Sequence, residues 1–380
     1  MKRAALVYVI LALLGGAVRL RGGEVDRLML WEIENSPKSV YLLGTVHVLQ
    51  PEDYPLPAEI ERVFQESTQI VFEVDLDDLS LEQNQVLLLE LALYLSEGSL
   101  PEDLSSATYA LLMEYVQANG MDFLGFPLGL SLPIEMFRPW YVSSRIGLTE
   151  GMKYGYDAQR APDLVLFDRA KAGGKTVLAL ETVPFQLGIL GGGTPFEQDR
   201  ELRRTLESVP TFGEELEQIV GAWRCGDLEA LRRILHQEAE TDPVAFERLI
   251  TARNRAWIER IEPLLESDET TLVVGGAGHM VGENGIPNQL RLRGHRVRQL
   301  PVRSEDARLP RLRFAGVPPR ETDALELFVP VGWSFALQES DNLVEWRTLT
   351  TFFTTNEVHR FTPPEPGPRP ATFFRLISPP

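Results

Sequence analysis

Two segments of this 380-residue chain, more than two hundred residues apart, repeat one local pattern. In each, a short apolar run ends in Gly-x-x-His and is followed by a helical pattern and a second strand-like run. The first segment, residues 39–74, contains His47, and the second, residues 271–301, contains His279. Strands that alternate with helices are typical of parallel sheets, so both histidines are expected at the carboxyl edge of one sheet.

The sequence between these two units has mostly helical patterns, and its character changes after residue 304, where prolines cluster and only strand-like runs follow. The predicted fold class is therefore α/β: a sheet built from two strand–GxxH–helix–strand units with a helical insertion, plus a small C-terminal all-β module. The expected boundaries are an N-terminal segment (1–23), an α/β domain (24–304), a linker (305–310) and a small β-sandwich-like module (311–380).

The amino terminus has the pattern of an export signal. Lys2 and Arg3 precede an apolar run, residues 4–18, that is shorter than the roughly 20 residues of a membrane-spanning helix. We expect a signal peptide or an N-terminal anchor, and an extracytoplasmic bacterial protein that is periplasmic, membrane-anchored or secreted. Association with a membrane or cell surface would occur through this segment or the C-terminal module.

Composition excludes some partners and sites. The chain has 37 Lys and Arg against 55 Asp and Glu, a net charge of −18, which argues against nucleic acid as a partner. Cys225 is the only cysteine, so an intrachain disulfide and a cysteine-based metal site are ruled out.

Histidine and glutamate supply the candidate chemistry. An imidazole at a strand end suits a divalent metal or a general base, although a structural role for both histidines is the alternative. Glu73 ends the apolar run 69–74, where a free carboxylate is unfavourable unless it is paired or metal-bound. Glu181 ends the run 175–180 in the same way.

Arg253 and Asn254 form the third candidate group. Arg253 lies on the apolar stripe of a helical pattern, three residues after Ile250 and four before Trp257. An inward-facing arginine needs an anionic partner, which is Glu73, Glu181 or a substrate oxyanion. A surface position is the alternative.

Taken together, YLLGTVHVLQ, IVFEVDL, KTVLALETVPFQ, ARNRAW and VVGGAGHMVGENGI resemble the TraB/GumN family, which includes the Tiki metalloproteases. The resemblance covers residues 28–302. It implies an α/β body with a metal-dependent hydrolytic site, with manganese or cobalt as the metal and zinc as a third candidate. His47 and His279 match the motif histidines, and Glu73, Glu181 and Arg253-Asn254 match the family's acids and helix pair.

The leading hypothesis is an exported, metal-dependent hydrolase of peptidase type that acts on a peptide or small molecule. His47 and His279 would bind the metal, with Glu73 as third ligand or general base, and Arg253 would stabilise an oxyanion. One alternative is a metal-independent His/Glu hydrolase of esterase type. Another is a protein that binds and sequesters a peptide without turnover.

Overall fold

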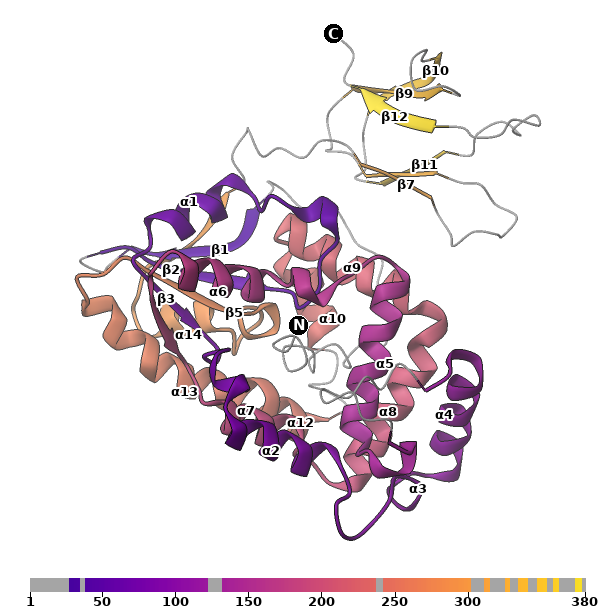
Figure 1. Cartoon of the computed structure of the whole chain (residues 1–380). Helices are drawn as coiled ribbons and strands as arrows, with labels where there is room; N and C mark the ends of the chain where they lie inside the picture. Colours follow the sequence, from indigo (N-terminus) through magenta and orange to yellow (C-terminus); the bar gives the residue numbers. More distant parts are fainter. Residues whose placement is uncertain are drawn as a thin grey trace. The chain divides into compact units, whose positions relative to one another are not determined.

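The computed structural model describes residues 27–34, 38–121, 132–236 and 242–301, and six strands beyond residue 310. The described residues fall into two compact units, one ending at residue 301 and the other beginning at residue 311 (Figure 1). The expected export segment and the linker 305–310 lie outside the described residues. None of the described helices combines the length and the apolar character that a membrane span requires.

The first unit is built on a six-stranded mixed sheet with the strand order β4-β3-β5-β2-β1-β6. Four neighbouring strands of this sheet, from β4 to β2, are parallel. The strands are β1 (Arg27–Ile33), β2 (Val40–Thr45), β3 (Gln69–Phe72), β4 (Thr176–Ala179), β5 (Thr271–Gly276) and β6 (Val297–Pro301).

The two repeated units form as predicted, but each spans more of the sheet than a simple βαβ unit. The first is β2, helix α1 (Ala58–Glu66) and β3, with β5 inserted between its strands. The second is β5, helix α14 (Ile286–Leu292) and β6, with β2 and β1 between its strands. Strand β1, which sequence reasoning missed, pairs antiparallel with both β2 and β6. The α/β class and the helical insertion are confirmed.

The insertion is helical and has a core of its own. Buried side chains of three of its helices form a cluster separate from the main core, including Leu112, Trp140, Ile146 and Leu202. The helices between β3 and β5 are α2 (Glu82–Ala92), α3 (Leu100–Asp103), α4 (Ser106–Asn119), α5 (Pro139–Lys153), α6 (Pro162–Ala172), α7 (Val183–Leu190), α8 (Pro195–Ser208), α9 (Phe212–Cys225), α10 (Leu228–Leu235), α12 (Pro243–Phe246), a π-helical stretch (Glu247–Thr251) and α13 (Ala252–Ile261).

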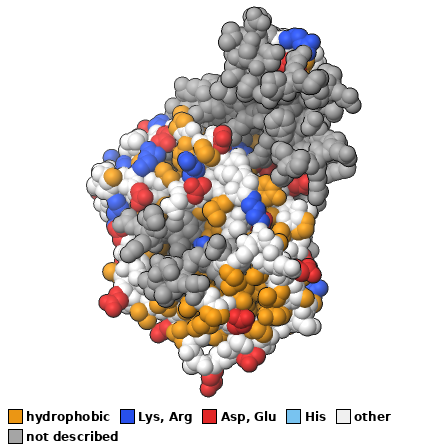
Figure 2. All heavy atoms as spheres, turned by 45° about the vertical axis from the view of Figure 1, so that its right-hand side comes forward, with side chains coloured by type: hydrophobic (Ala, Val, Ile, Leu, Met, Phe, Trp, Pro, Cys, Tyr) orange, Lys and Arg blue, Asp and Glu red, His pale blue; other side chains and the backbone are white. Residues whose placement is uncertain are grey.

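The main core joins the sheet to the helices that follow its strands. Leu42 and Val273, on the neighbouring strands β2 and β5, are fully buried, and Phe167 of α6 and Trp257 of α13 belong to the same cluster. Acidic and basic side chains are scattered over the face shown in Figure 2, and apolar side chains gather in its lower half.

The second unit contains only strands within its described residues, as expected for an all-β module. One antiparallel sheet has the order β10-β9-β12 and the other β11-β8-β7. Their strands are β7 (Arg311–Phe314), β8 (Leu325–Phe328), β9 (Ser334–Ser340), β10 (Arg347–Phe353), β11 (Val358–Phe361) and β12 (Phe373–Ile377).

Candidate functional site

Four candidate side chains follow the carboxyl ends of the four parallel strands. His47 comes two residues after β2, His279 three after β5, Glu73 directly after β3, and Glu181 two after β4. These strands are neighbours in the order β4-β3-β5-β2, so their carboxyl ends meet at one edge. Ligands bind at this edge in open α/β sheets, because the strands end there and the loops diverge.

Gly276 marks the point around which three of these side chains converge. A Cβ atom at this glycine would lie 3.4 Å from Glu73 Oε1, 3.5 Å from His47 Nε2 and 3.7 Å from His279 Cδ2. The Gly276 N–H also donates to Glu73 Oε1 at 2.7 Å. The missing side chain therefore leaves a small space that is lined by both motif histidines and the first glutamate.

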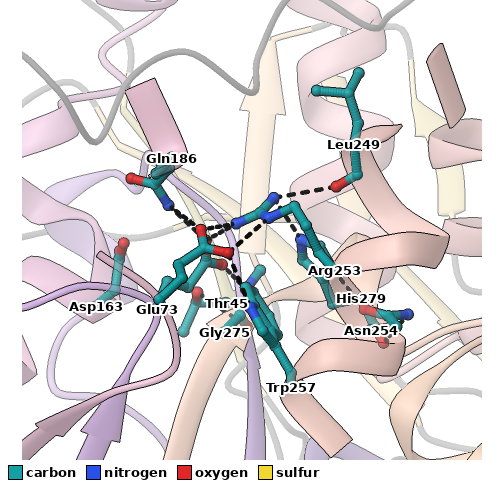
Figure 3. A network of polar contacts seen from close by, with 12 residues as sticks. Thr45, Glu73, Asp163, Gln186, Leu249, Arg253, Asn254, Trp257, Gly275 and His279 are labelled. Atoms are coloured by element: carbon teal, nitrogen blue, oxygen red, sulfur yellow. Dashed lines mark hydrogen bonds and ion pairs between the residues drawn. The ribbon is translucent and has the colours of Figure 1, made fainter. Parts of the chain in front are cut away.

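Arg253 lies in the middle of the acidic part of this site (Figure 3). Its Nη2 donates to Glu73 Oε2 at 2.8 Å and to Glu181 Oε1 at 2.7 Å, and its Nε donates to Glu181 Oε2 at 3.1 Å. Its Nη1 donates to Leu249 O at 3.1 Å and to His279 Nε2 at 3.0 Å. A guanidinium has five N–H donors, so these five contacts use all of them.

The inward position predicted for Arg253 is therefore correct, and both predicted carboxylate partners, Glu73 and Glu181, accept hydrogen bonds from it. Burial alone would lower the pKa of Arg253, but Glu73 and Glu181 together raise it, so the guanidinium stays charged. Direct stabilisation of a substrate oxyanion by Arg253 would require it to release one of its five acceptors.

The hydrogen bonds of His279 define its tautomer. An arginine can only donate, so Nε2 of His279 accepts, and the ring proton is on Nδ1. Nδ1 then donates to Asn254 Oδ1, 2.6 Å away. Burial, Arg253 and the other two histidines nearby, His47 and His236, hold the pKa of His279 well below its ordinary value, so the ring is neutral.

Asn254 holds the neutral histidine in place. Besides accepting from the ring, its amide nitrogen donates to the carbonyl oxygens of His279 at 3.2 Å and of Asn284 at 2.8 Å. The indole of Trp257 packs on the imidazole, with ring centroids 4.2 Å apart. The adjacent residues Arg253 and Asn254 thus contact the two nitrogens of one imidazole ring, so the predicted Arg-Asn pair acts on a single histidine.

His47 has a different environment. Its Nδ1 lies 3.5 Å from Asp163 Oδ2, a separation longer than a normal hydrogen bond, and its Nε2 faces the space beside Gly276. Burial lowers the pKa of His47, but Asp163, and more weakly Glu73, outweigh this effect, and the net pKa is raised. The imidazole is thus the more basic of the two site histidines.

Glu181 and Gln186 complete the network. Glu181 accepts from Arg253, from Trp257 Nε1 at 2.9 Å and from Gln186 Nε2 at 3.1 Å, and Gln186 also donates to Glu73 Oε2 at 3.0 Å. Burial raises the pKa of Glu181, and the adjacent Arg253 opposes this rise. Gln186 follows Glu181 by five residues on α7, where it links the two carboxylates.

Sequence reasoning missed Asp163 and Gln186. Asp163 is an acidic residue in the first turn of α6, after Pro162, and helices commonly begin this way. Nothing in its spacing relates it to His47. Gln186 lies in the TVPFQ segment but carried no signal of its own.

The loop that carries His47 is held at both ends by α9. Trp223 Nε1 donates to the carbonyl oxygen of Gly44 at 2.7 Å, before the histidine. The next residue, Arg224, donates to both carboxylate oxygens of the buried Asp53, at 2.7 and 3.0 Å, after it. The position of His47 therefore depends on two adjacent residues of one helix.

The predicted metal ligands do not fit a shared ion in this arrangement. The single lone pair of the neutral His279 ring, on Nε2, already accepts from Arg253. Among the described residues, no group of three His, Cys, Asp or Glu side chains is placed to hold a metal ion. Binding of an ion by His47, His279 and Glu73 together would require Arg253 to move.

Comparison with known proteins places the chain among its relatives. It is 23% identical to an uncharacterized protein of Treponema pallidum over 321 residues, 77% of this chain and 91% of that protein. It is 26% identical over 342 residues to a protein of Danio rerio named metalloprotease TIKI1, covering 78% of this chain and 67% of that protein. No solved structure matches. The family model for TraB/PrgY/gumN matches residues 29–299, most of the chain and all of the site, and the protein belongs to the TraB/PrgY/gumN family.

Proposed function

We propose that the protein is a hydrolase in which His47 removes a proton from the attacking water. The observation that carries this proposal is the placement of one imidazole between Asp163, at Nδ1, and the space beside Gly276, at Nε2. A carboxylate at one ring nitrogen favours the tautomer whose other nitrogen can accept a proton. The membership of the family and the similarity to a protein named a metalloprotease fit a hydrolase.

In the proposed reaction, a substrate carbonyl group lies in the space beside Gly276. His47 Nε2 takes a proton from water, the hydroxide attacks the carbonyl carbon, and the protonated imidazole returns its proton to the leaving group. Glu73 does not serve as the partner of His47 here, because it accepts from Gly276, Arg253 and Gln186. Its role, together with Glu181, is to hold the arginine and the loop that carries Gly276.

The substrate we propose is a peptide or a small ester or amide, encountered outside the cytoplasm. The support for an exported protein is the N-terminal pattern of Lys2, Arg3 and the apolar run 4–18. The support for a peptide is the name of the zebrafish relative, a metalloprotease.

Metal-dependent hydrolysis is the second candidate, and the zebrafish relative favours it. In that case His47, His279 and Glu73 would hold the ion, and it would supply an activated water. Manganese, cobalt or zinc would be the metal. The contact between Arg253 and His279 is the feature of this chain that opposes it.

One experiment compares these candidates. The purified protein is tested on p-nitrophenyl acetate and a pool of fluorogenic peptides, with and without EDTA, and with Mn²⁺ added back. We expect turnover that survives EDTA, falls by about 10²–10⁴-fold in His47→Gln and falls at least about tenfold in Asp163→Asn. Asp168→Asn, on the exposed side of the same helix, is the control and should change nothing.

Other outcomes favour the other candidates. Loss of activity in EDTA with recovery in Mn²⁺ would establish the metal-dependent mechanism instead. Tight binding of a peptide without turnover of any probe would support a sequestering protein and overturn the proposal.

A further inference from the structure

The buried guanidinium of Arg253 occupies a site whose acceptors come from four separate elements. Glu73 follows β3, Glu181 follows β4, His279 follows β5, and Leu249 lies in the π-helical stretch. Figure 3 shows Glu73, His279 and Leu249 around Arg253. The Arg253 side chain is 1% exposed, and its guanidinium carbon lies 4.7 Å from the centre of the Trp257 ring. The arginine is therefore buried, and each of its five N–H groups donates a hydrogen bond.

These acceptors are of the kind that also bind divalent cations. Carboxylates and neutral imidazoles are donor types that first-row metals bind. With Arg253 in place, no three such side chains among the described residues are positioned around one ion. Their formal charge is −2, which Arg253 reduces to −1. Without the guanidinium, the two carboxylates would be buried and unpaired, and the lone pair on His279 Nε2 would have no donor from this residue.

We infer that Arg253 is the resident cation of this site and that a divalent metal ion competes with it for the same acceptors. The arginine and the ion exclude each other because His279 Nε2 has one lone pair, which cannot serve both. This inference concerns cation binding and does not depend on the proposed hydrolytic activity.

The acceptors are held by residues other than Arg253, so they should remain in place when it is replaced. Asn254 fixes both the ring and the backbone of His279. Gly276 and Gln186 each hold one oxygen of Glu73, and Trp257 holds Glu181. Removal of the guanidinium would thus leave these acceptors near one another with one more negative charge, and a metal ion would draw them together.

The test measures the binding of Mn²⁺ alone to the full-length protein, by titration calorimetry and by the loss of the free-ion EPR signal. We expect Arg253→Met to bind Mn²⁺ at least tenfold more tightly than the unaltered protein. His279→Gln in the Arg253→Met background should reverse most of that gain. Arg253→Lys, which retains a cation, is the matched control and should stay near the unaltered protein.

Arg253→Met leaves two buried carboxylates without their partner, so it is accompanied by a second variant. Arg253→Met with Glu181→Gln removes one of these charges and retains Glu73, His47 and His279. If the single variant does not fold, the double variant should show the tenfold gain. Mn²⁺ binding by the folded variants that is no tighter than that of the unaltered protein would overturn the inference. So would tight binding by the unaltered protein that is lost in Arg253→Met. The hydrolase proposal fails separately, when the His47 and Asp163 variants retain full activity.

Discussion

His279 accepts a hydrogen bond from Arg253 at 3.0 Å, and this contact distinguishes the two histidines of the site. It fixes His279 as a neutral ring whose only lone pair is in use. His47 has no such donor in its contacts and instead faces a carboxylate, Asp163. The two histidines of the Gly-x-x-His motifs thus have different roles. His279 is a hydrogen-bond acceptor within the fold, and His47 is the general base that we propose.

Gly276→Ala tests the space in which we place the substrate. The glycine has φ −58° and ψ 143°, which alanine adopts freely, and its Cβ would make ordinary contacts of 3.4–3.7 Å. We expect the free energy of unfolding to change by less than about 1 kcal/mol, while hydrolysis falls at least tenfold. Gly278→Ala, whose Cβ would meet Ile250 at 3.5 Å, is the control and should stay active. Equal activity of the two variants would place the substrate elsewhere.

Asn254→Asp tests the hydrogen bonds by which Asn254 holds His279 in place. A carboxylate would still accept from the ring but would face the carbonyl oxygens of His279 and Asn284 without a donor. We expect a loss of about 2–4 kcal/mol in the free energy of unfolding, measured by urea denaturation. Asn288→Asp, whose amide bonds a single carbonyl at the surface, should lose less than about 1 kcal/mol. Similar losses in the two variants would show that the hydrogen bonds of Asn254 to His279 and Asn284 contribute no more to stability than a surface hydrogen bond.

Arg224→Met tests how α9 holds the loop of His47. The variant removes the guanidinium that pairs with Asp53, whose side chain is 2% exposed. Breaking such a buried pair typically destabilises a protein by about 3–5 kcal/mol. Arg203→Met breaks an exposed pair with Glu207 and should lower the free energy of unfolding by less than about 0.5 kcal/mol in the same urea experiment. Amide exchange in residues 47–54 should accelerate only in the Arg224 variant. Unchanged exchange of these residues in that variant would show that Arg224 does not hold the loop.

Glu201, on α8, should make stability depend on pH. Burial raises its pKa to about 7 from an ordinary 4.5, although Arg204 and Arg248 oppose the rise. The folded state therefore retains a proton that the unfolded state releases, and stability is lost as pH rises from about 4.5 through about 7. Glu201→Gln should thus be more stable than the unaltered protein at pH 8, by up to about 3 kcal/mol, and equal to it at pH 4. Glu207→Gln, an exposed change on the same helix, should show no such gain, and a gain for Glu201→Gln at pH 4 would contradict the assignment.

The sequence predicted those parts of the site that local pattern controls. A strand that ends in Gly-x-x-His, or in a glutamate after an apolar run, carries its side chain to the carboxyl edge wherever the strand lies in the sheet. The helical stripe likewise placed Arg253 inward, because burial follows the periodicity of a helix.

Other features depend on tertiary packing and left no local trace. The insertion of β5 between β2 and β3 is set by which strands pair, and it brings His279 next to Glu73. Asp163 lies near His47 only because α6 packs against β3 and β4 of the same sheet, and its own segment is an ordinary helix start. The five acceptors of Arg253 come from four elements. The spacing of residues along the sequence therefore could not show that all five of its N–H donors have an acceptor.

The most direct test is a proton NMR titration of the histidine rings in EDTA-treated protein, assigned with His47→Gln and His279→Gln. We expect the pKa of His47 to lie above its ordinary value of 6.5 and to fall in Asp163→Asn. His279 should remain neutral to well below pH 6.5 in both proteins. A His47 pKa that does not respond to Asp163→Asn, or a His279 that takes up its proton before His47 does, would contradict the roles assigned to the two rings.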